Sequence, residues 1–270
     1  MKYAIWFLRL VFAAWFIPAG LNHFIPLFPQ PMGNQPLSTE LITALIDSHL
    51  FDLVKFVELV AGIAVLTGWY MPLMLVVCMP VSFCVWYWDT PLQGWGTVSS
   101  IYGWAAFGSN ALLCLAYLGS YRKLFEIGAT AKAPVPKNVL LAGRLLFGAW
   151  LLVSGINYFV GSLYPIPTGT TPLAMQLATA LDDSGMMGVV KGIEIVTGAL
   201  IVTGAFVPLA LCVTMPLSAC TFVVGALIDH QPIGIVASTL FVGLNGLLML
   251  AYLDYYKDML VRHAPTLGET

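Results

Sequence analysis

Residues 54–58 read Val-Lys-Phe-Val-Glu, and residues 190–194 read Val-Lys-Gly-Ile-Glu. Each stretch places a lysine and a glutamate three residues apart in an otherwise apolar segment. On a helix, two side chains at that spacing share one face. Apolar helical segments of about 20 residues match the roughly 30 Å hydrocarbon core of a bilayer. The chain therefore carries the same charged pair twice, in segments suited to lipid.

Working outward from these two stretches, the repetition extends along nearly the whole chain. The offset between matching residues is 135 near the ends of the repeat and 136 in its middle, where one residue is inserted. Polar matches at so many positions indicate an internal duplication. The aligned polar pairs are Arg9 with Arg144, Asn22 with Asn157, Lys55 with Lys191, Glu58 with Glu194, and Asn110 with Asn245.

The composition and the apolar segments predict an all-α integral membrane protein. Of the 270 residues 59% are hydrophobic and 9% are charged, whereas soluble domains carry about 25% charged residues. We expect eight transmembrane helices, arranged as two parallel-oriented four-helix bundles. Their ranges are 3–24, 51–69, 71–89, 97–119, 140–161, 186–205, 207–228 and 233–253.

The domain organisation and the orientation follow from the repeat and from the loops. The first unit spans 1–125 and the second 140–258, joined by a cytoplasmic linker at 126–139 and followed by a cytoplasmic tail at 259–270. An even number of crossings per unit gives both units the same orientation. Lys and Arg are absent from the loops of one side, which are 25–50, 90–96, 162–185 and 229–232. The positive-inside rule then places both termini in the cytoplasm and the protein in the cytoplasmic membrane.

The loop between the first two predicted spans of each unit is too long for a hairpin. Leu37, Leu41 and Leu45 recur at helical spacing in the first unit. This periodicity predicts a short amphipathic helix on the outer membrane surface. Residues 172–184 form its predicted counterpart in the second unit.

The candidate site residues are polar groups inside the predicted spans, where ionised side chains are costly and need partners. Depth along the helices predicts a contact of Arg9 with Asn110, and its copy between Arg144 and Asn245. A second set lies near the outer surface. In the first unit this outer cluster contains Asn22, His23, Lys55 and Glu58, and in the second unit Asn157, Lys191 and Glu194.

Two interpretations of these polar groups remain open. The pairs can lock helix packing in lipid, or the outer clusters can bind the polar head of a quinone or a lipid and relay protons. His23 has no partner histidine and is replaced by Tyr158 in the second unit, so we expect no metal site. None of the five cysteines forms a Cys-x-x-Cys pair. A net charge of −2 gives no basic surface for nucleic acid.

The repeated motifs resemble a known family. The first unit carries an early arginine, then Gly20-Leu21-Asn22-His23-Phe24 and Val54-Lys55-Phe56-Val57-Glu58, and the second unit carries Gly155-Ile156-Asn157-Tyr158-Phe159 and its own Lys–Glu stretch. Each half is similar to the DoxX family of four-helix membrane proteins, which includes the DoxD subunit of thiosulfate:quinone oxidoreductase. The resemblance covers nearly the whole chain twice, and the tandem fusion departs from the usual single unit.

The resemblance implies a function class but no catalytic residues. We expect a cytoplasmic-membrane subunit that supports a redox process linked to quinone, with a quinone as the implied cofactor and another membrane redox protein as the implied partner. If the chain takes part in catalysis, it does so as an oxidoreductase subunit and not as a self-sufficient enzyme. The alternative is a non-catalytic scaffold or assembly factor for a partner membrane complex. A carrier for a small solute is a third interpretation, since parallel repeats occur in transporters.

Overall fold

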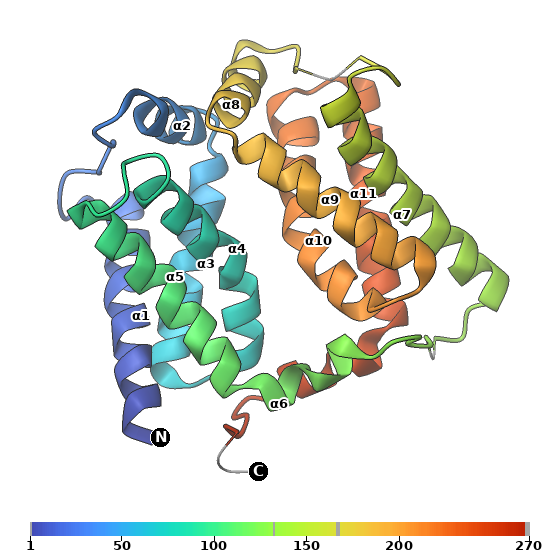
Figure 1. Ribbon diagram of the computed structural model, residues 1–270, viewed down its shortest axis with the longest axis horizontal. Helices are drawn as coiled ribbons and strands as arrows, with labels where there is room; N and C mark the ends of the chain where they lie inside the picture. Colours follow the sequence, from blue (N-terminus) through green and yellow to red (C-terminus); the bar gives the residue numbers. More distant parts are fainter. Residues whose placement is uncertain (1, 132, 166–167, 268–270) are drawn as a thin grey trace. The chain divides into compact units, whose positions relative to one another are not determined.

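The computed structural model describes residues 2–131, 133–165 and 168–267, and within these ranges every regular element is helical. The chain divides into two compact units. The first consists of Met1–Arg122 together with Lys257–Thr270, and the second consists of Lys123–Tyr256. Each unit is built on four long helices and carries one short helix across one end (Figure 1).

In the first unit, the four long helices are α1 (Lys2–Phe24), α3 (Leu50–Thr67), α4 (Met71–Asp89) and α5 (Val98–Ala116). Helix α1 packs mainly against α3, and α4 packs against α5. The core is apolar, with Phe12, Phe16 and Leu75 fully buried. The short helix α2 (Pro36–Asp47) is attached by the indole of Trp88, whose Nε1 donates to the carbonyl oxygen of Ser38 at 2.8 Å.

The second unit repeats this order. Its long helices are α7 (Lys137–Val160), α9 (Met186–Thr203), α10 (Val207–Phe222), which continues as the π-helix η2 (Val223–Ile228), and α11 (Pro232–Ala251). Its short helix α8 (Pro172–Asp183) is attached through Asp229. One carboxylate oxygen of Asp229 accepts hydrogen bonds from the backbone N–H and the hydroxyl of Thr170, at 2.6 and 2.7 Å. It also accepts from the N–H of Thr171, the residue that caps α8.

Seven helices of the described chain are long and apolar enough to cross a membrane. The eighth predicted span, α3, is not among them. Although α3 has 18 residues, it carries Asp52, Lys55 and Glu58, and this charge sets it apart from the other long helices. Both short helices predicted from the loop periodicity are present, as α2 and α8.

Tight hairpins connect the second and third long helices of each unit. Gly68 ends α3 and Gly204 ends α9, both in the left-handed conformation at φ of 81° and 82°. A side chain is strained at such angles, which is why glycine commonly follows the last helical residue. Pro72 and Pro208 lie in the first turns of α4 and α10, where a missing N–H costs nothing.

The segment that begins at Lys257 packs on the first unit. It includes the 3-10 turn η4 (Lys257–Met259), which contacts α4 and the short helix α6 (Leu118–Tyr121). The carbonyl oxygen of Arg262 accepts from the N–H of Tyr70 at 2.9 Å, and its guanidinium lies 4.5 Å above the ring of Trp69. The N–H of Leu267 donates to the carbonyl of Ala116 at 3.0 Å. The α3–α4 hairpin, the end of α5 and residues 262–267 therefore meet at one end of the first unit.

Candidate functional site: the repeated lysine–glutamate pair

Glycines hold the helices that carry the charged pairs close to their neighbours. A Cβ atom on Gly20 of α1 would lie 2.8 Å from the carbonyl oxygen of Lys55 on α3. In the second unit, a Cβ on Gly155 of α7 would lie 2.7 Å from the carbonyl oxygen of Lys191 on α9. Such approaches are typical of small residues at helix interfaces in membranes. They bring the first helix of each unit directly beside its lysine.

The pair of the first unit is a buried salt bridge. Lys55 Nζ lies 2.8 Å from Glu58 Oε2, and the two side chains are only 10% and 1% exposed. The ammonium group also lies 4.6 Å from the centre of the Phe51 ring, within the range of a cation–π interaction. The sequence-predicted pairing on one helix face is thus present, and the bundle encloses it.

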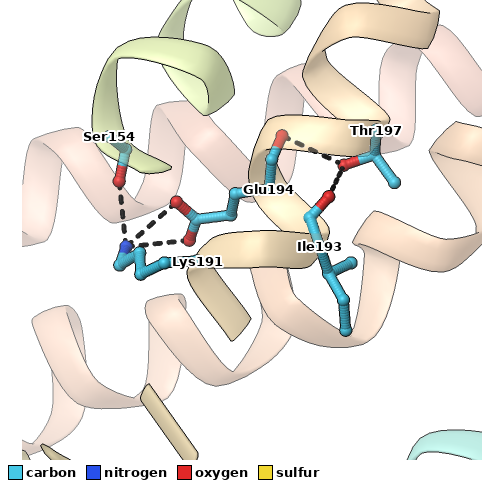
Figure 2. A network of polar contacts seen from close by, with 5 residues as sticks. All are labelled: Ser154, Lys191, Ile193, Glu194 and Thr197. Atoms are coloured by element: carbon cyan, nitrogen blue, oxygen red, sulfur yellow. Dashed lines mark hydrogen bonds and ion pairs between the residues drawn. The ribbon is translucent and has the colours of Figure 1, made fainter. Parts of the chain in front are cut away.

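The pair of the second unit is part of a larger network (Figure 2). Lys191 Nζ contacts both carboxylate oxygens of Glu194, at 2.9 and 3.0 Å, and donates to Ser154 Oγ at 2.9 Å. The two charged side chains are 20% and 7% exposed. The hydroxyl of Thr197 donates to the carbonyl oxygen of Ile193, so it does not compete for the carboxylate. This lysine therefore has a hydroxyl partner, whereas the second contact of Lys55 among the described residues is the ring of Phe51.

Ser154 is a residue that the sequence reasoning missed. It lies on α7 directly before Gly155, and at the offset of 135 its counterpart in the first unit is Ala19. The exchange of a methyl group for a hydroxyl at this position of an apolar span could have pointed to Ser154.

The two outer asparagines are engaged in the loops that follow the first helix of each unit. Asn22 Oδ1 accepts from the N–H groups of Leu27 and Phe28, both at 2.8 Å. Asn157 is held by Leu163 and Tyr164, whose N–H groups donate to its Oδ1 at 2.9 and 3.1 Å. These asparagines fold the exit turns, and their amides point to the loop backbone and not to the charged pair.

His23 is bound to a different carboxylate from that of the pair. Its Nε2 lies 2.7 Å from Asp52 Oδ1, and His49 contacts the other oxygen of Asp52 at 3.1 Å. Tyr158, which replaces His23 in the second unit, instead hydrogen-bonds Asp182. Among the described residues, no group of three His, Cys, Asp or Glu side chains is placed to hold a metal ion.

The predicted contact between Arg9 and Asn110 is wrong. Arg9 Nε and Nη2 donate to the carbonyl oxygens of Val65 and Leu66, each at 2.8 Å. The last carbonyls of a helix have no intrahelical donor, so the end of α3 offers acceptors at the depth where the sequence suggested the asparagine. The guanidinium also lies 4.0 Å above the ring of Trp6.

The copy of that contact, Arg144 with Asn245, is wrong as well. Arg144 approaches Gly204 at the end of α9, where a Cβ would lie 3.3 Å from both terminal guanidinium nitrogens. Its Nε is buried, and no hydrogen-bond partner for it exists within the described residues. The two arginines thus occupy matching places, but the Nε of Arg9 has a hydrogen-bond acceptor and that of Arg144 has none among the described residues.

The inner asparagines join the third and fourth long helices. Asn110 contacts the hydroxyl of Ser82 at 2.9 Å; with its amide oxygen facing Ser82, its nitrogen donates to the carbonyl of Leu75 at 3.1 Å. Asn245 Nδ2 donates to the hydroxyls of Thr214 and Ser218, at 3.1 and 2.9 Å. Both asparagines are fully buried. They tie α4 to α5 and α10 to α11.

The first unit also buries a carboxyl group that the second unit lacks. Asp89, at the end of α4, is 4% exposed and accepts from Gln93 Nε2 at 3.1 Å. It packs against Gly103 of α5, where a Cβ would lie only 2.8 Å from Asp89 Cβ. In the second unit the small residue is on the other helix, because Gly225 faces Ser238. The two units therefore differ in the packing at the end of the third long helix.

Comparison of the chain with protein-family models, with curated proteins and with solved structures found no match.

Proposed function

We propose that the protein spans a membrane eight times, as two four-span units inserted with the same orientation. Seven of the helices are apolar enough on their own. The charges of α3 are partnered, since Lys55 binds Glu58 and Asp52 binds His23. With 18 residues, α3 extends about 27 Å, close to the thickness of the hydrocarbon core. Helices α2 and α8 then lie on the outer surface.

The proposed location is the cytoplasmic membrane with both termini in the cytoplasm. Lys and Arg are absent from the loops on the side of α2 and α8, which the positive-inside rule assigns to the outside. Within the first unit, residues 262–267 meet the α3–α4 hairpin and the end of α5. This arrangement supports a tail on the side opposite α2.

The biochemical role that we propose is that of a DoxX-type subunit supporting a redox process linked to quinone. The observation that carries this proposal is the buried lysine–glutamate pair, present at matching positions in both units. A lysine donates hydrogen bonds and a glutamate accepts protons. Ionisable pairs kept within membrane spans commonly mark ligand sites or proton relays. The implied partners are the lipid bilayer and a second membrane redox protein.

Quinone extraction and two conservative variants test this role. The protein is purified in mild detergent and extracted for quinones, and quinone-linked reduction rates are measured in membranes. Glu58→Gln and Glu194→Gln keep the side-chain shape but remove the negative charge, so each should lower the rate. Glu40→Gln on α2, where the glutamate is exposed, is the matched control and should leave it unchanged. An absence of quinone together with unchanged rates in both variants refutes the role.

The alternative role is a scaffold for a partner membrane complex. Trp86, Trp95 and Trp104 form an aromatic group at the outer end of the first unit. The ring centroid of Trp86 lies 6.2 Å from that of Trp95 and 5.4 Å from that of Trp104. Trp95 is strongly exposed. Gentle affinity purification distinguishes the roles: a stoichiometric partner that is lost on Trp95→Ala, with rates unaffected by Glu58→Gln, supports the scaffold.

A further inference from the structure

An open groove of about 360 Å³ runs along one side of α7 in the second unit. Most of its lining residues follow one helix face, at intervals of three and four. Tyr164, from the loop after α7, also lines it, and its backbone N–H and carbonyl group are both bound by Asn157. The lining residues are Leu146, Ala149, Trp150, Val153, Ser154 and Tyr164. The groove is thus apolar except near Ser154 and Tyr164.

The hydroxyl of Ser154 has a hydrogen to donate into this groove. Its oxygen accepts from Lys191 Nζ (Figure 2). Two other serines in the spans turn their hydroxyls back to the helix: Ser109 donates to the carbonyl of Ala106, and Ser238 donates to that of Ile235. Ser154 makes no such bond to its own helix within the described chain. Because a hydroxyl both accepts and donates, the hydrogen of Ser154 is left to donate to an acceptor in the groove.

We propose that this groove binds an amphipathic molecule through a carbonyl oxygen that accepts the hydrogen bond of Ser154. This proposal rests on the proposed quinone-linked role and assigns the binding step to the second unit. The ammonium group of Lys191 polarises the hydroxyl, which strengthens its donation. Trp150 offers a flat apolar wall beside it, and Leu146 and Val153 face an apolar tail. The first unit has Ala19 in place of Ser154, and so it lacks the donor.

The depth of Ser154 favours a ring carbonyl, as in a quinone, over the ester of a phospholipid. Helix α7 has 24 residues and is about 36 Å long, which exceeds a 30 Å core by about 3 Å at each end. Ser154 lies six residues before Val160, or about 9 Å along the axis. The hydroxyl is therefore about 6 Å inside the hydrocarbon, whereas phospholipid esters lie at its boundary.

Binding of decylubiquinone to the full chain in lipid nanodiscs tests the assignment. Ser154→Ala removes the donor and should weaken binding about tenfold, the effect of one neutral hydrogen bond. Ser154→Thr keeps a hydroxyl and should bind nearly as well as the parent. Ser109→Ala is the matched control, because that hydroxyl donates only to its own helix. The carbonyl stretch of ¹³C-labelled decylubiquinone should shift on binding to the parent and not on binding to Ser154→Ala.

The outcomes separate this assignment from the proposed role. If the parent and Ser154→Ala bind decylubiquinone equally and show the same carbonyl shift, the assignment falls while the quinone-linked role stands. If the parent binds none, both fall. If Ser154→Ala loses only a co-purified phospholipid, measured by mass spectrometry, the groove holds a lipid ester and the ring assignment is overturned. Equal melting temperatures of the serine variants exclude misfolding as the cause.

Discussion

Removing one member of the Lys55–Glu58 pair should destabilise the first unit far more than removing both. The two charged atoms are 2.8 Å apart and the side chains are almost completely buried. At an effective dielectric constant of 20, their attraction is roughly 6 kcal/mol, much of which offsets the desolvation of the two charges. Glu58→Leu leaves an ammonium group without its partner, and Lys55→Met leaves a carboxylate. Each single change should cost about 3–5 kcal/mol.

The double variant Lys55→Met with Glu58→Leu leaves no buried charge. Its stability should fall within about 1 kcal/mol of the parent or exceed it. The cycle of four proteins, unfolded by sodium dodecyl sulfate in mixed micelles, should then give a coupling energy of at least about 5 kcal/mol, since two single costs of about 3 kcal/mol or more are set against about 1 kcal/mol for the double variant. The control is the exposed pair of His49 and Asp52, at 81% and 46% exposure, where His49→Ala should cost less than about 1 kcal/mol. A coupling energy near zero for the buried pair refutes this reasoning.

Three further predictions concern glycine packing, a loop cap and pH. Gly20→Ala places a methyl group 2.8 Å from the backbone of α3 and should lower the melting temperature, whereas Gly108→Ala, in open space on α5, should leave it unchanged or slightly raised. Asn22→Ala removes the acceptor of two loop N–H groups and should lower the free energy of unfolding by about 1–3 kcal/mol. Proteolysis within residues 25–35 should become faster, and an unchanged proteolysis rate contradicts the role of Asn22 as a loop cap. Hydrogen bonds from Thr170 hold the pKa of Asp229 below its usual range. The carboxylate therefore contributes stability above the ordinary pKa of about 3.9, and this contribution fades as the pH falls through the lowered value. Because the group is exposed, the effect should stay below about 1 kcal/mol, and Asp229→Asn should abolish this pH dependence of α8 protection in hydrogen exchange.

Periodic features were the most predictable from the sequence. The long apolar segments, the glycine–proline hairpins and the leucine spacing of α2 each reflect local rules that need no knowledge of the neighbours. The Lys55–Glu58 contact belongs to the same class, because a spacing of three residues on one helix brings the two side chains together. The partners of Arg9 were not predictable in this way. Carbonyl groups at a helix end carry no sequence signature, and any residue could have supplied them.

The candidate site was only partly predictable, for a related reason. The sequence predicts similar depths for Asn22 and Glu58, but depth alone does not tell whether an amide faces the bundle or folds back on its own loop. The backbone N–H groups of residues 27 and 28 decided that question. The contribution of Ser154 depends on the close approach that Gly155 permits, and such an approach appears only when two helices are placed together.

The return of residues 257–267 to the first unit has a consequence for biosynthesis. The four long helices of that unit emerge from the ribosome well before the segment that binds Tyr70 and Ala116 is translated. The first unit therefore stays incomplete after insertion until residues 257–267 have emerged. Its assembly cannot be strictly vectorial, and an early stop codon after α11 would leave the α3–α4 hairpin without its last contacts.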